Sequence, residues 1–207
     1  SPFFAQLCAA MYGLWIDTKT GKRFVNELAD RKIRADAIIR VGNKCIAMTD
    51  AYGFSIGQKL IAESLPVLME RGVVKKYETL EEMAAAYSCP IEPLKETIEK
   101  FNKGVAAGKD EEWGRYLQKN QKPLGPGPWY ALRLTPKIHH CMGGVNINVK
   151  AQALDVMTDQ PIPGLYAAGE ASGGVHGAVR LGSCATLDCL IFGRIAGRNA
   201  AAEKTWG

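Results

Sequence analysis

Several features of membrane, metal-binding and nucleic-acid-binding proteins are missing from this chain. No apolar run approaches the ~20 residues of a transmembrane helix, and no secretory leader pattern is present. The six cysteines contain no Cys-x-x-Cys pair, which argues against a zinc site or a haem attachment site and makes structural thiols the expectation. No block of Lys or Arg stands out, so we expect no nucleic-acid partner.

The composition is that of an ordinary globular protein. The 207 residues are 47% hydrophobic and 23% charged, with 26 basic and 21 acidic side chains and a net charge of +5. This length accommodates one large or two small domains. The mild positive excess is spread along the chain and suits small anionic substrates.

Hydrophobic spacing and turn signals predict a mixed α+β segment followed by a strand-rich segment that ends in a long helix. Strands are expected at residues 13–17, 23–27, 37–39, 45–48, 130–134, 144–149 and 165–168, and helices at 58–70, 80–87, 91–104 and 186–204. Thr79 and Glu82 predict a capping box. The proline-rich stretch 123–128 predicts a boundary, so we expect domains at residues 1–125 and 126–207.

The most informative stretch is a glycine-dense loop near the C-terminus. An apolar strand in residues 163–170 (PGLYAAGE) leads into residues 173–183 (GGVHGAVRLGS) and then into a helical pattern. Glycines at this density let a backbone lie against a flat or phosphorylated ligand, and a helix that begins there directs free N–H groups at it. This predicts half of a nucleotide-cofactor site. The Gly-x-Gly-x-x-Gly turn of the other half is absent, so the chain is expected to be a fragment or to rely on a second chain.

Four elements carry candidate chemistry, and each has an ordinary explanation when taken alone. They are residues 21–27 (GKRFVNE) with Arg31, 139–144 (HHCMGG), 168–170 (AGE) and 176–183 (HGAVRLGS). Arg31 lies in a charged run typical of a solvated face. Two adjacent histidines on a strand would point to opposite faces, so we expect no metal site there. Glu170 and Arg180 are also explained as a loop cap and a partner for a nearby carboxylate.

Taken together, the four elements resemble in order and spacing the flavoprotein subunit family of fumarate reductases, in its soluble flavocytochrome c and urocanate reductase branch. The resemblance covers nearly the whole chain and is strongest between residues 139 and 199. It implies FAD as the cofactor. It also implies an α+β capping domain joined to the C-terminal part of an α/β, Rossmann-like FAD-binding domain, without the N-terminal dinucleotide-binding half.

The resemblance implies catalytic and substrate-binding roles for four residues. Arg31 would deliver a proton to the substrate, and His139 and Arg180 would bind its carboxylate, with Ser183 as a backbone contact. Reduction of a C=C bond by flavin hydride leaves negative charge that spreads into the carboxylate. Guanidinium and imidazole donors are suited to stabilise that charge.

Four further residues are implied as cofactor contacts. His140 would face the flavin, Glu170 would hold FAD hydroxyls, and Ala185 and Thr186 would offer backbone contacts at the pyrimidine end. The positive end of the helix that begins there would stabilise negative charge on the reduced flavin.

Residues 5–12 (AQLCAAMY) depart from the family pattern. Where fumarate-specific members carry a Thr-Glu pair and an Arg, the resemblance aligns Gln6, Leu7 and Ala10, and neither Leu nor Ala passes a proton. This predicts a 2-enoate with one carboxylate and a more apolar far end, lined by Tyr12 or Met11.

Two other functions remain open: a ketosteroid-type flavin dehydrogenase and a non-catalytic binding fragment. The expected partners are a small unsaturated carboxylate and an electron donor such as a haem domain, an FMN domain or another carrier. The family includes periplasmic and cytoplasmic forms, so the compartment stays open. We expect the isolated chain to bind FAD poorly and to be inactive.

Overall fold

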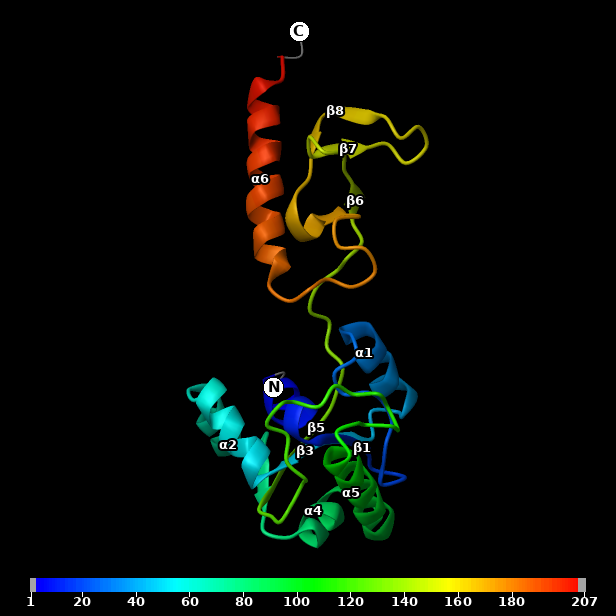
Figure 1. The fold of residues 1–207 in the computed structure, drawn as a ribbon. Coiled ribbons are helices and arrows are strands. Elements are labelled where there is room, and N and C mark those ends of the chain that lie inside the picture. The colour runs from blue at the N-terminus through cyan, green and yellow to red at the C-terminus, as the bar shows by residue number, and fades with distance from the viewer. Residues whose placement is uncertain (1–2, 205–207) are drawn as a thin grey trace. The chain divides into compact units, whose positions relative to one another are not determined.

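The computed structural model describes residues 3–204, which form two compact units (Figure 1). Unit 1 is Ser1–Pro136 and unit 2 is Lys137–Gly207. The division falls later than the expected boundary between residues 125 and 126. The reason is strand β5 (Trp129–Arg133), which follows the proline-rich stretch and pairs with β3 (Cys45–Asp50) in the sheet of unit 1.

Unit 1 is built on a five-stranded antiparallel sheet. The strand order is β2–β1–β3–β5–β4, with β1 at Leu14–Asp17, β2 at Lys22–Arg23 and β4 at Lys75–Tyr77. All six residues of the central strand β3 are buried, because helices cover both faces of the sheet. Unit 1 therefore has the mixed helix and strand content expected of it.

The two faces of this sheet carry separate hydrophobic cores. The helices of unit 1 are the π-helix η1 (Phe4–Ala10), α1 (Arg31–Arg40), α2 (Ala51–Leu60), α3 (Ser64–Glu70), α4 (Leu80–Tyr87) and α5 (Ile91–Ala106). Trp15 and Leu132 belong to the core closed by η1, α1, α2 and α3, whereas Leu14 and Ile16 belong to the core closed by α4 and α5 (Figure 1). The alternation along β1 follows from the two-residue period of a strand.

Helices α4 and α5 confirm their sequence predictions. The Thr79 side chain accepts from the backbone N–H of Glu82 at 3.1 Å, and the Glu82 carboxylate accepts from the N–H of Thr79 at 3.4 Å, which completes the capping box. Ser88 ends α4 in the left-handed region at φ 53°. Helix α5 buries Leu94, Ile98 and Phe101 along one side, as their spacing indicates.

Three local predictions for unit 1 were wrong or incomplete. Residues 37–39, expected as a strand, lie in α1, which begins where the Asp30 side chain accepts from the N–H of Ile33 at 2.9 Å. The helix expected at 58–70 is instead two helices, α2 and α3, separated by residues 61–63, and α2 begins early, where the Asp50 side chain accepts from the N–H of Gly53 at 2.9 Å. The hairpin is confirmed, but its return strand ends at Arg23 and is followed by a turn in which Asn26 accepts from the N–H of Leu28.

Unit 2 contains two small sheets and one long helix. Its elements are β6 (Val145–Asn146) parallel to β9 (Ser172–Gly173), β7 (Gln152–Leu154) antiparallel to β8 (Pro161–Tyr166), the 3-10 turn η2 (Gly169–Ala171) and α6 (Cys184–Ala202). The last helix is close to its prediction. The strand expected at 144–149 is reduced to β6. The buried strand expected at 165–168 is correct only for residues 165 and 166, because β8 runs from Pro161 to Tyr166, and its burial is wrong, because Leu165 is 48% exposed.

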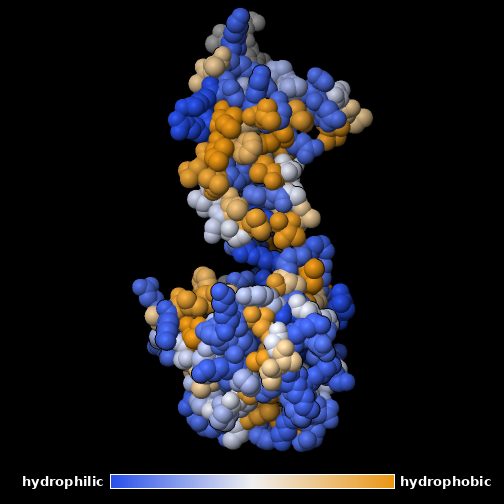
Figure 2. All heavy atoms as spheres, in the orientation of Figure 1, coloured by the Kyte–Doolittle hydropathy of each residue, from blue (hydrophilic) through white to orange (hydrophobic). Residues whose placement is uncertain are grey.

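Helix α6 presents an unusual distribution of polarity. Asp188 is the only buried residue among those the structure describes in this helix. The large apolar side chains of Leu187, Leu190 and Ile191 are instead exposed, and Figure 2 shows apolar surface gathered on the α6 side of unit 2.

Candidate functional site

The glycine-rich segments of unit 2 make close backbone contacts. A Cβ on Gly144 would collide with the carbonyl oxygen of Ala171, and one on Gly173 would lie 2.8 Å from the nitrogen of Gly144. Gly169 has φ +68°, and a Cβ there would lie 2.7 Å from Sγ of Cys189 on α6. The glycines therefore bring segment 139–144, turn η2 and α6 together around Glu170.

Glu170 joins two of these segments. Its Oε1 accepts a hydrogen bond from the backbone N–H of Cys141 at 2.9 Å, and its Oε2 lies 3.4 Å from Nδ1 of His140. The hydrogen bond from Cys141, helped by the positive charges of His140, His139 and Arg180, lowers the pKa of Glu170 below its usual value. Glu170 is therefore an anion at neutral pH.

His140 also contacts a second histidine. The rings of His140 and His176 meet edge to face, with centroids 5.4 Å apart and an interplanar angle of 73°. His176 Nε2 lies 3.2 Å from Oδ2 of Asp188. The side chains of His140, His176 and Asp188 are only 7%, 11% and 3% exposed. Glu170, His140, His176 and Asp188 thus form one continuous row of side chains, which we call the histidine row.

Two members of the histidine row received no role from the sequence. His176 lay inside a predicted element without an assignment, and Asp188 was missed. The available signal was that Asp188 is the only acidic residue in α6. A lone carboxylate in an apolar helix is rarely buried without a partner.

Polar atoms in and beside the histidine row are left without hydrogen-bond partners. Arg180 is 7% exposed, and its Nη1 donates to the carbonyl of Leu181 at 2.8 Å. Arg180 Nε, His140 Nε2 and Asp188 Oδ1 are buried and unpaired. Buried polar atoms are normally paired, since leaving one unpaired costs about 1–3 kcal/mol. Unit 2 therefore has unused hydrogen-bonding capacity for a polar ligand.

The start of α6 offers further donors. Ser183 precedes the helix in the left-handed region at φ 66°, and its side chain makes no capping hydrogen bond. Ala185 and Thr186 lie in the first turn, where backbone N–H groups have no acceptor within the helix. The first turn also carries partial positive charge, which favours an electron-rich ligand.

Three predicted residues do not belong to the histidine row. His139 is exposed, and the segment that holds it and His140 has no regular secondary structure, so the expected strand end is wrong there. Arg31 belongs to unit 1, where it is the exposed first residue of α1, directly after its cap Asp30. Tyr12, a candidate for the apolar end of the substrate site, is 7% exposed and donates to Oδ1 of Asn120 at 2.9 Å.

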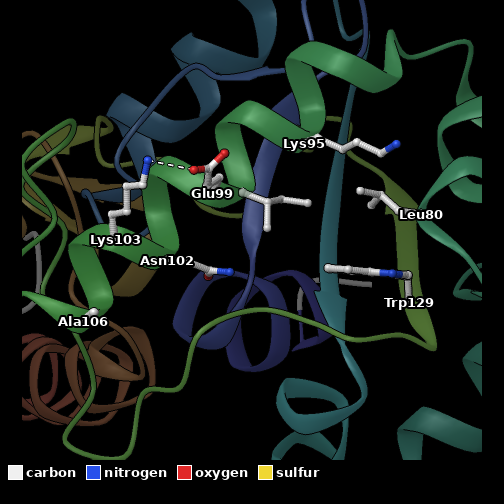
Figure 3. Close-up of a pocket in the computed structure, with 8 residues that line it drawn as sticks. Leu80, Lys95, Glu99, Asn102, Lys103, Ala106 and Trp129 are labelled. Carbon is white, nitrogen blue, oxygen red and sulfur yellow. Dashed lines mark ion pairs between the residues drawn. The ribbon is translucent and has the colours of Figure 1, made fainter.

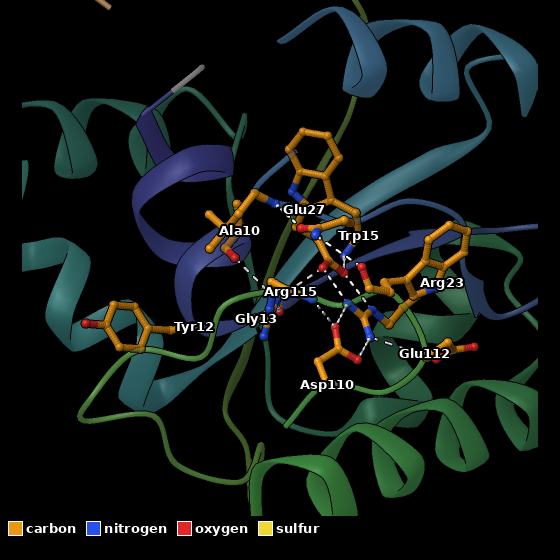
Figure 4. Close-up of polar contacts among 12 residues, drawn as sticks. Ala10, Tyr12, Gly13, Trp15, Arg23, Glu27, Asp110, Glu112 and Arg115 are labelled. Atoms are coloured by element: carbon orange, nitrogen blue, oxygen red, sulfur yellow. Dashed lines mark hydrogen bonds and ion pairs between the residues drawn. The ribbon is translucent and has the colours of Figure 1, made fainter. Parts of the chain in front are cut away.

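Unit 1 contains a network of buried charges (Figure 4), of which only the segment with Arg23 and Glu27 was singled out from the sequence. Arg23 bonds Glu27 and Asp110, and Arg115 Nη1 lies 3.3 Å from Oε2 of Glu27. Phe101 of α5 lies beneath both guanidinium groups, 5.4 Å from Arg23 and 4.5 Å from Arg115. Two cations and two carboxylates balance, which makes their burial tolerable.

The pKa shifts of the two arginines have different causes. Burial lowers the pKa of Arg115. Burial acts the same way on Arg23, but its hydrogen bonds to Asp110 and Glu27 outweigh this and raise its pKa. Arg115 Nη1 also donates to the carbonyls of Ala10 and Gly13 at 3.2 and 2.6 Å. The network thus ties the end of η1 to the two loops at residues 24–30 and 110–115.

A surface groove in unit 1 contains none of the predicted site residues (Figure 3). This groove, of about 550 Å³, is lined by residues of α5 together with Leu80 and Trp129. Within residues 3–204, no three His, Cys, Asp or Glu side chains are placed to ligate a metal ion. Over the same residues, no helix is both long and apolar enough to cross a bilayer.

Comparison with known proteins identifies the family. The model of the FAD-binding domain family matches residues 6–186. The chain belongs to this family. Its cofactor is therefore FAD, and the resemblance to fumarate reductase flavoproteins is confirmed.

Three individual proteins resemble this chain in sequence or in fold. The chain is 36% identical over 195 residues to the acrylate reductase flavoprotein subunit of Shewanella woodyi, covering 90% of this chain and 37% of the relative. A flavocytochrome c3 fumarate reductase in its open conformation aligns with TM-score 0.69 and 35% identity, covering 93% of this chain and 33% of that one. A 3-ketosteroid Δ4-(5α)-dehydrogenase from Rhodococcus jostii aligns with TM-score 0.67 and 28% identity, covering 97% and 40%. The chain spans well under half the length of each.

The residues of unit 2 fit part of a flavin site. The unpaired His140 Nε2 and the free N–H groups at the start of α6 match a ring system edged with carbonyl oxygens and nitrogens. Gly143, Gly174 and Gly177 have open space where a Cβ would stand, so a ligand can approach their backbone.

Proposed function

We propose that the protein containing this chain uses FAD to reduce the carbon–carbon double bond of a small unsaturated carboxylate, either fumarate or another 2-enoate. FAD, when bound and reduced, supplies a hydride to one alkene carbon. Arg31 gives a proton to the other carbon and regains one from water, so the product is the saturated acid. The supporting observation is the set of buried polar atoms without hydrogen-bond partners on Arg180 and His140 in a chain of the FAD-binding family.

The carboxylate of the substrate is assigned to Arg180, His139 and the backbone of Ser183. Arg180 is buried, uses Nη1 on the carbonyl of Leu181 and keeps Nε unpaired. A partly desolvated guanidinium makes strong charge-assisted bonds to a carboxylate. His139 is exposed, so its ring is accessible to an anion.

The cofactor contacts are assigned to His140, Glu170, Ala185 and Thr186. Glu170 is ionised because of its lowered pKa, which makes it an acceptor for FAD hydroxyl groups. Ala185 and Thr186 present backbone donors in the first turn of α6. The positive end of the helix lowers the cost of negative charge on the ring.

Arg31 is assigned as the proton donor. Its place as the first residue of α1 is fixed by the Asp30 cap, and its exposure gives water direct access for reprotonation. Leu7 and Ala10 of η1 are apolar where fumarate-specific members are expected to carry ionisable side chains, which supports a substrate with one carboxylate and an apolar far end. Acrylate, named in the Shewanella woodyi relative, has this character.

A ketosteroid dehydrogenase is the second candidate, because the Rhodococcus jostii enzyme shares the fold at 28% identity. The charged side chains of unit 2 favour an anion over a ketone. Arg180 is a buried permanent cation, and a neutral steroid ketone leaves its charge unpaired.

A substrate panel with the full-length protein tests the proposal. Reduced viologen serves as the electron donor, with fumarate, acrylate, methacrylate, cinnamate, urocanate and a 3-ketosteroid as substrates. Arg31→Ala is expected to abolish enoate reduction and to leave flavin reduction unchanged, whereas Arg40→Ala at the other end of α1 keeps both. Enoate turnover by Arg31→Ala contradicts the assigned acid. A full-length protein that lacks the yellow colour of bound flavin contradicts the proposed enzymatic function and favours a non-catalytic binding fragment.

The isolated 207-residue chain is expected to bind FAD weakly and to be inactive. Its sequence contains no Gly-x-Gly-x-x-Gly turn to hold the diphosphate. Titration of the chain with FAD, followed by quenching of flavin fluorescence, measures this. A submicromolar dissociation constant would contradict it.

A further inference from the structure

Asp188 is a buried carboxylate with one polar neighbour. It is 6% exposed, and its Oδ1 has no hydrogen-bond partner. Only Oδ2 is paired, with His176 Nε2 at 3.2 Å. An ionised carboxylate is costly to bury unless it is hydrogen-bonded, so its contact with His176 is the interaction that makes Asp188 tolerable in α6.

The carboxylate also sets the proton on His176. An ionised carboxylate only accepts hydrogen bonds, so an ionised Asp188 requires the hydrogen of this contact to lie on Nε2 of His176. In the neutral ring Nδ1 is then an acceptor, and the ring cannot rotate without losing its bond to Asp188. A carboxylate behind a histidine fixes both ring orientation and tautomer in many sites.

His176 in turn restrains His140. The edge-to-face contact at 5.4 Å holds one side of the His140 ring, and Glu170 holds its Nδ1 at 3.4 Å. His140 Nε2 is left buried and unpaired. His176 and Arg180 also share the loop that runs from β9 to α6. An anchor on His176 therefore restrains both side chains that carry a buried polar atom without a hydrogen-bond partner.

We propose that Asp188 is a positioning residue, which fixes His176 and through it the orientation of His140 and the loop that carries Arg180. The inference rests on the proposed function in treating His140 and Arg180 as ligand-binding residues. Asp188 itself contacts neither substrate nor cofactor in this proposal. Its effect is to keep the side chains of His140 and Arg180 in place before the ligand arrives, which removes an ordering cost from binding.

The first test is independent of activity. Full-length protein labelled with ¹⁵N-histidine is expected to show an exchange-protected, downfield imidazole Nε2 proton that disappears in Asp188→Asn. The matched control is Asp155→Asn, because Asp155 is a half-buried acid of the same unit whose carboxylate bonds only within its own turn. A wild-type spectrum without such a proton, or an Asp188→Asn spectrum that retains it, overturns the pair.

The second test is kinetic, with acrylate as the substrate probe and FAD content measured for each variant. Asp188→Asn is expected to lower kcat/KM about ten- to a hundredfold, mainly through KM, with FAD content unchanged. Asp155→Asn stays at the wild-type value. A kcat/KM within about twofold of wild type, or a loss fully accounted for by missing FAD, overturns the positioning role. A wild-type enzyme that reduces no enoate overturns the proposed function and not the positioning role. In that case the histidine spectrum still shows whether Asp188 and His176 are hydrogen-bonded.

Discussion

Arg23 and Asp110, 87 residues apart in the chain, are joined by two parallel hydrogen bonds, Nη1 to Oδ1 at 2.8 Å and Nη2 to Oδ2 at 2.7 Å. This paired geometry lets one arginine hold a distant loop against the end of β2. On its other side Arg23 holds Glu27 through Nε and Nη2. The segment leading to Arg31 is therefore fixed from inside unit 1.

Removing Arg23 is expected to destabilise the chain strongly. Arg23→Met leaves Glu27 and Asp110 buried with only Arg115 as a cation, and breaking a buried pair in this way costs about 3–5 kcal/mol. Urea denaturation followed by circular dichroism measures the free energy of unfolding. Arg40→Met, an exposed site on α1, is the control and should change it by no more than about 0.5 kcal/mol. Equal effects of the two substitutions contradict the network.

Stability is expected to fall at acid pH partly through Asp110. Burial would raise the pKa of Asp110, but hydrogen bonds from Arg23 and the charges of Arg23 and Arg115 lower it below its usual value of 3.8. The folded-state pKa is thus below the unfolded-state pKa. The stabilisation is complete above about pH 4 and is lost as the pH falls through the folded-state value.

The Asp110→Asn variant isolates this contribution. It is expected to be less stable than wild type at pH 7 and to lose less stability between pH 5 and the acid end of the titration. Denaturation midpoints across that range give both curves. If the plots of denaturation midpoint against pH are parallel for wild type and variant, Asp110 has the same pKa in the folded and unfolded states, which contradicts the prediction.

Loss of the capping box is expected to weaken α4 moderately. Thr79→Ala removes the acceptor for the N–H of Glu82 and costs about 1 kcal/mol. Thr79→Ser keeps a hydroxyl in the same place and should stay close to wild type. Chemical denaturation of the three proteins side by side decides whether the hydroxyl or the shape of the side chain matters.

The six thiols are expected to fall into two classes. Burial raises the pKa of Cys8 and Cys45 to about 12 and of Cys89 to about 11, so about 0.1% or less of each is ionised at pH 8. Cys141 and Cys189 are exposed, and Cys184 is half-buried. Labelling of the 207-residue chain with a disulfide reagent, read by mass spectrometry, should modify Cys141 and Cys189 first. Early modification of Cys8 contradicts the buried placement, and labelling in denaturant supplies the control.

Sequence reasoning succeeded where the deciding interaction is local. The capping box spans only Thr79 to Glu82, and the apolar stripe of α5 repeats every three or four residues, so both are visible in a short window. It failed for residues 37–39, whose branched side chains suggested a strand. There the Asp30 cap and the burial of Ala37 and Ile38 against the core outweigh local preference.

The candidate site was predictable only in part for the same reason. Glu170, His140 and Arg180 stand in recognisable motifs, and the structure places them in unit 2 within reach of one another's charge. Arg115 and Glu27 are 88 positions apart in the sequence, and no local pattern around either residue predicts their contact. Asp188 was detectable in principle as the only acid of α6, but its partner His176 lies in a loop whose course depends on backbone packing at Gly144, Gly169 and Gly173.

The exposed side chains of Leu187, Leu190 and Ile191 on α6 have a practical consequence for anyone purifying this chain alone. Neighbouring exposed hydrophobic side chains of this size bind hydrophobic dyes and promote self-association. We expect light scattering to rise with protein concentration and sucrose to worsen it, since excluded osmolytes strengthen apolar burial. Replacing Leu190 with lysine should improve solubility without disturbing the Asp188–His176 contact.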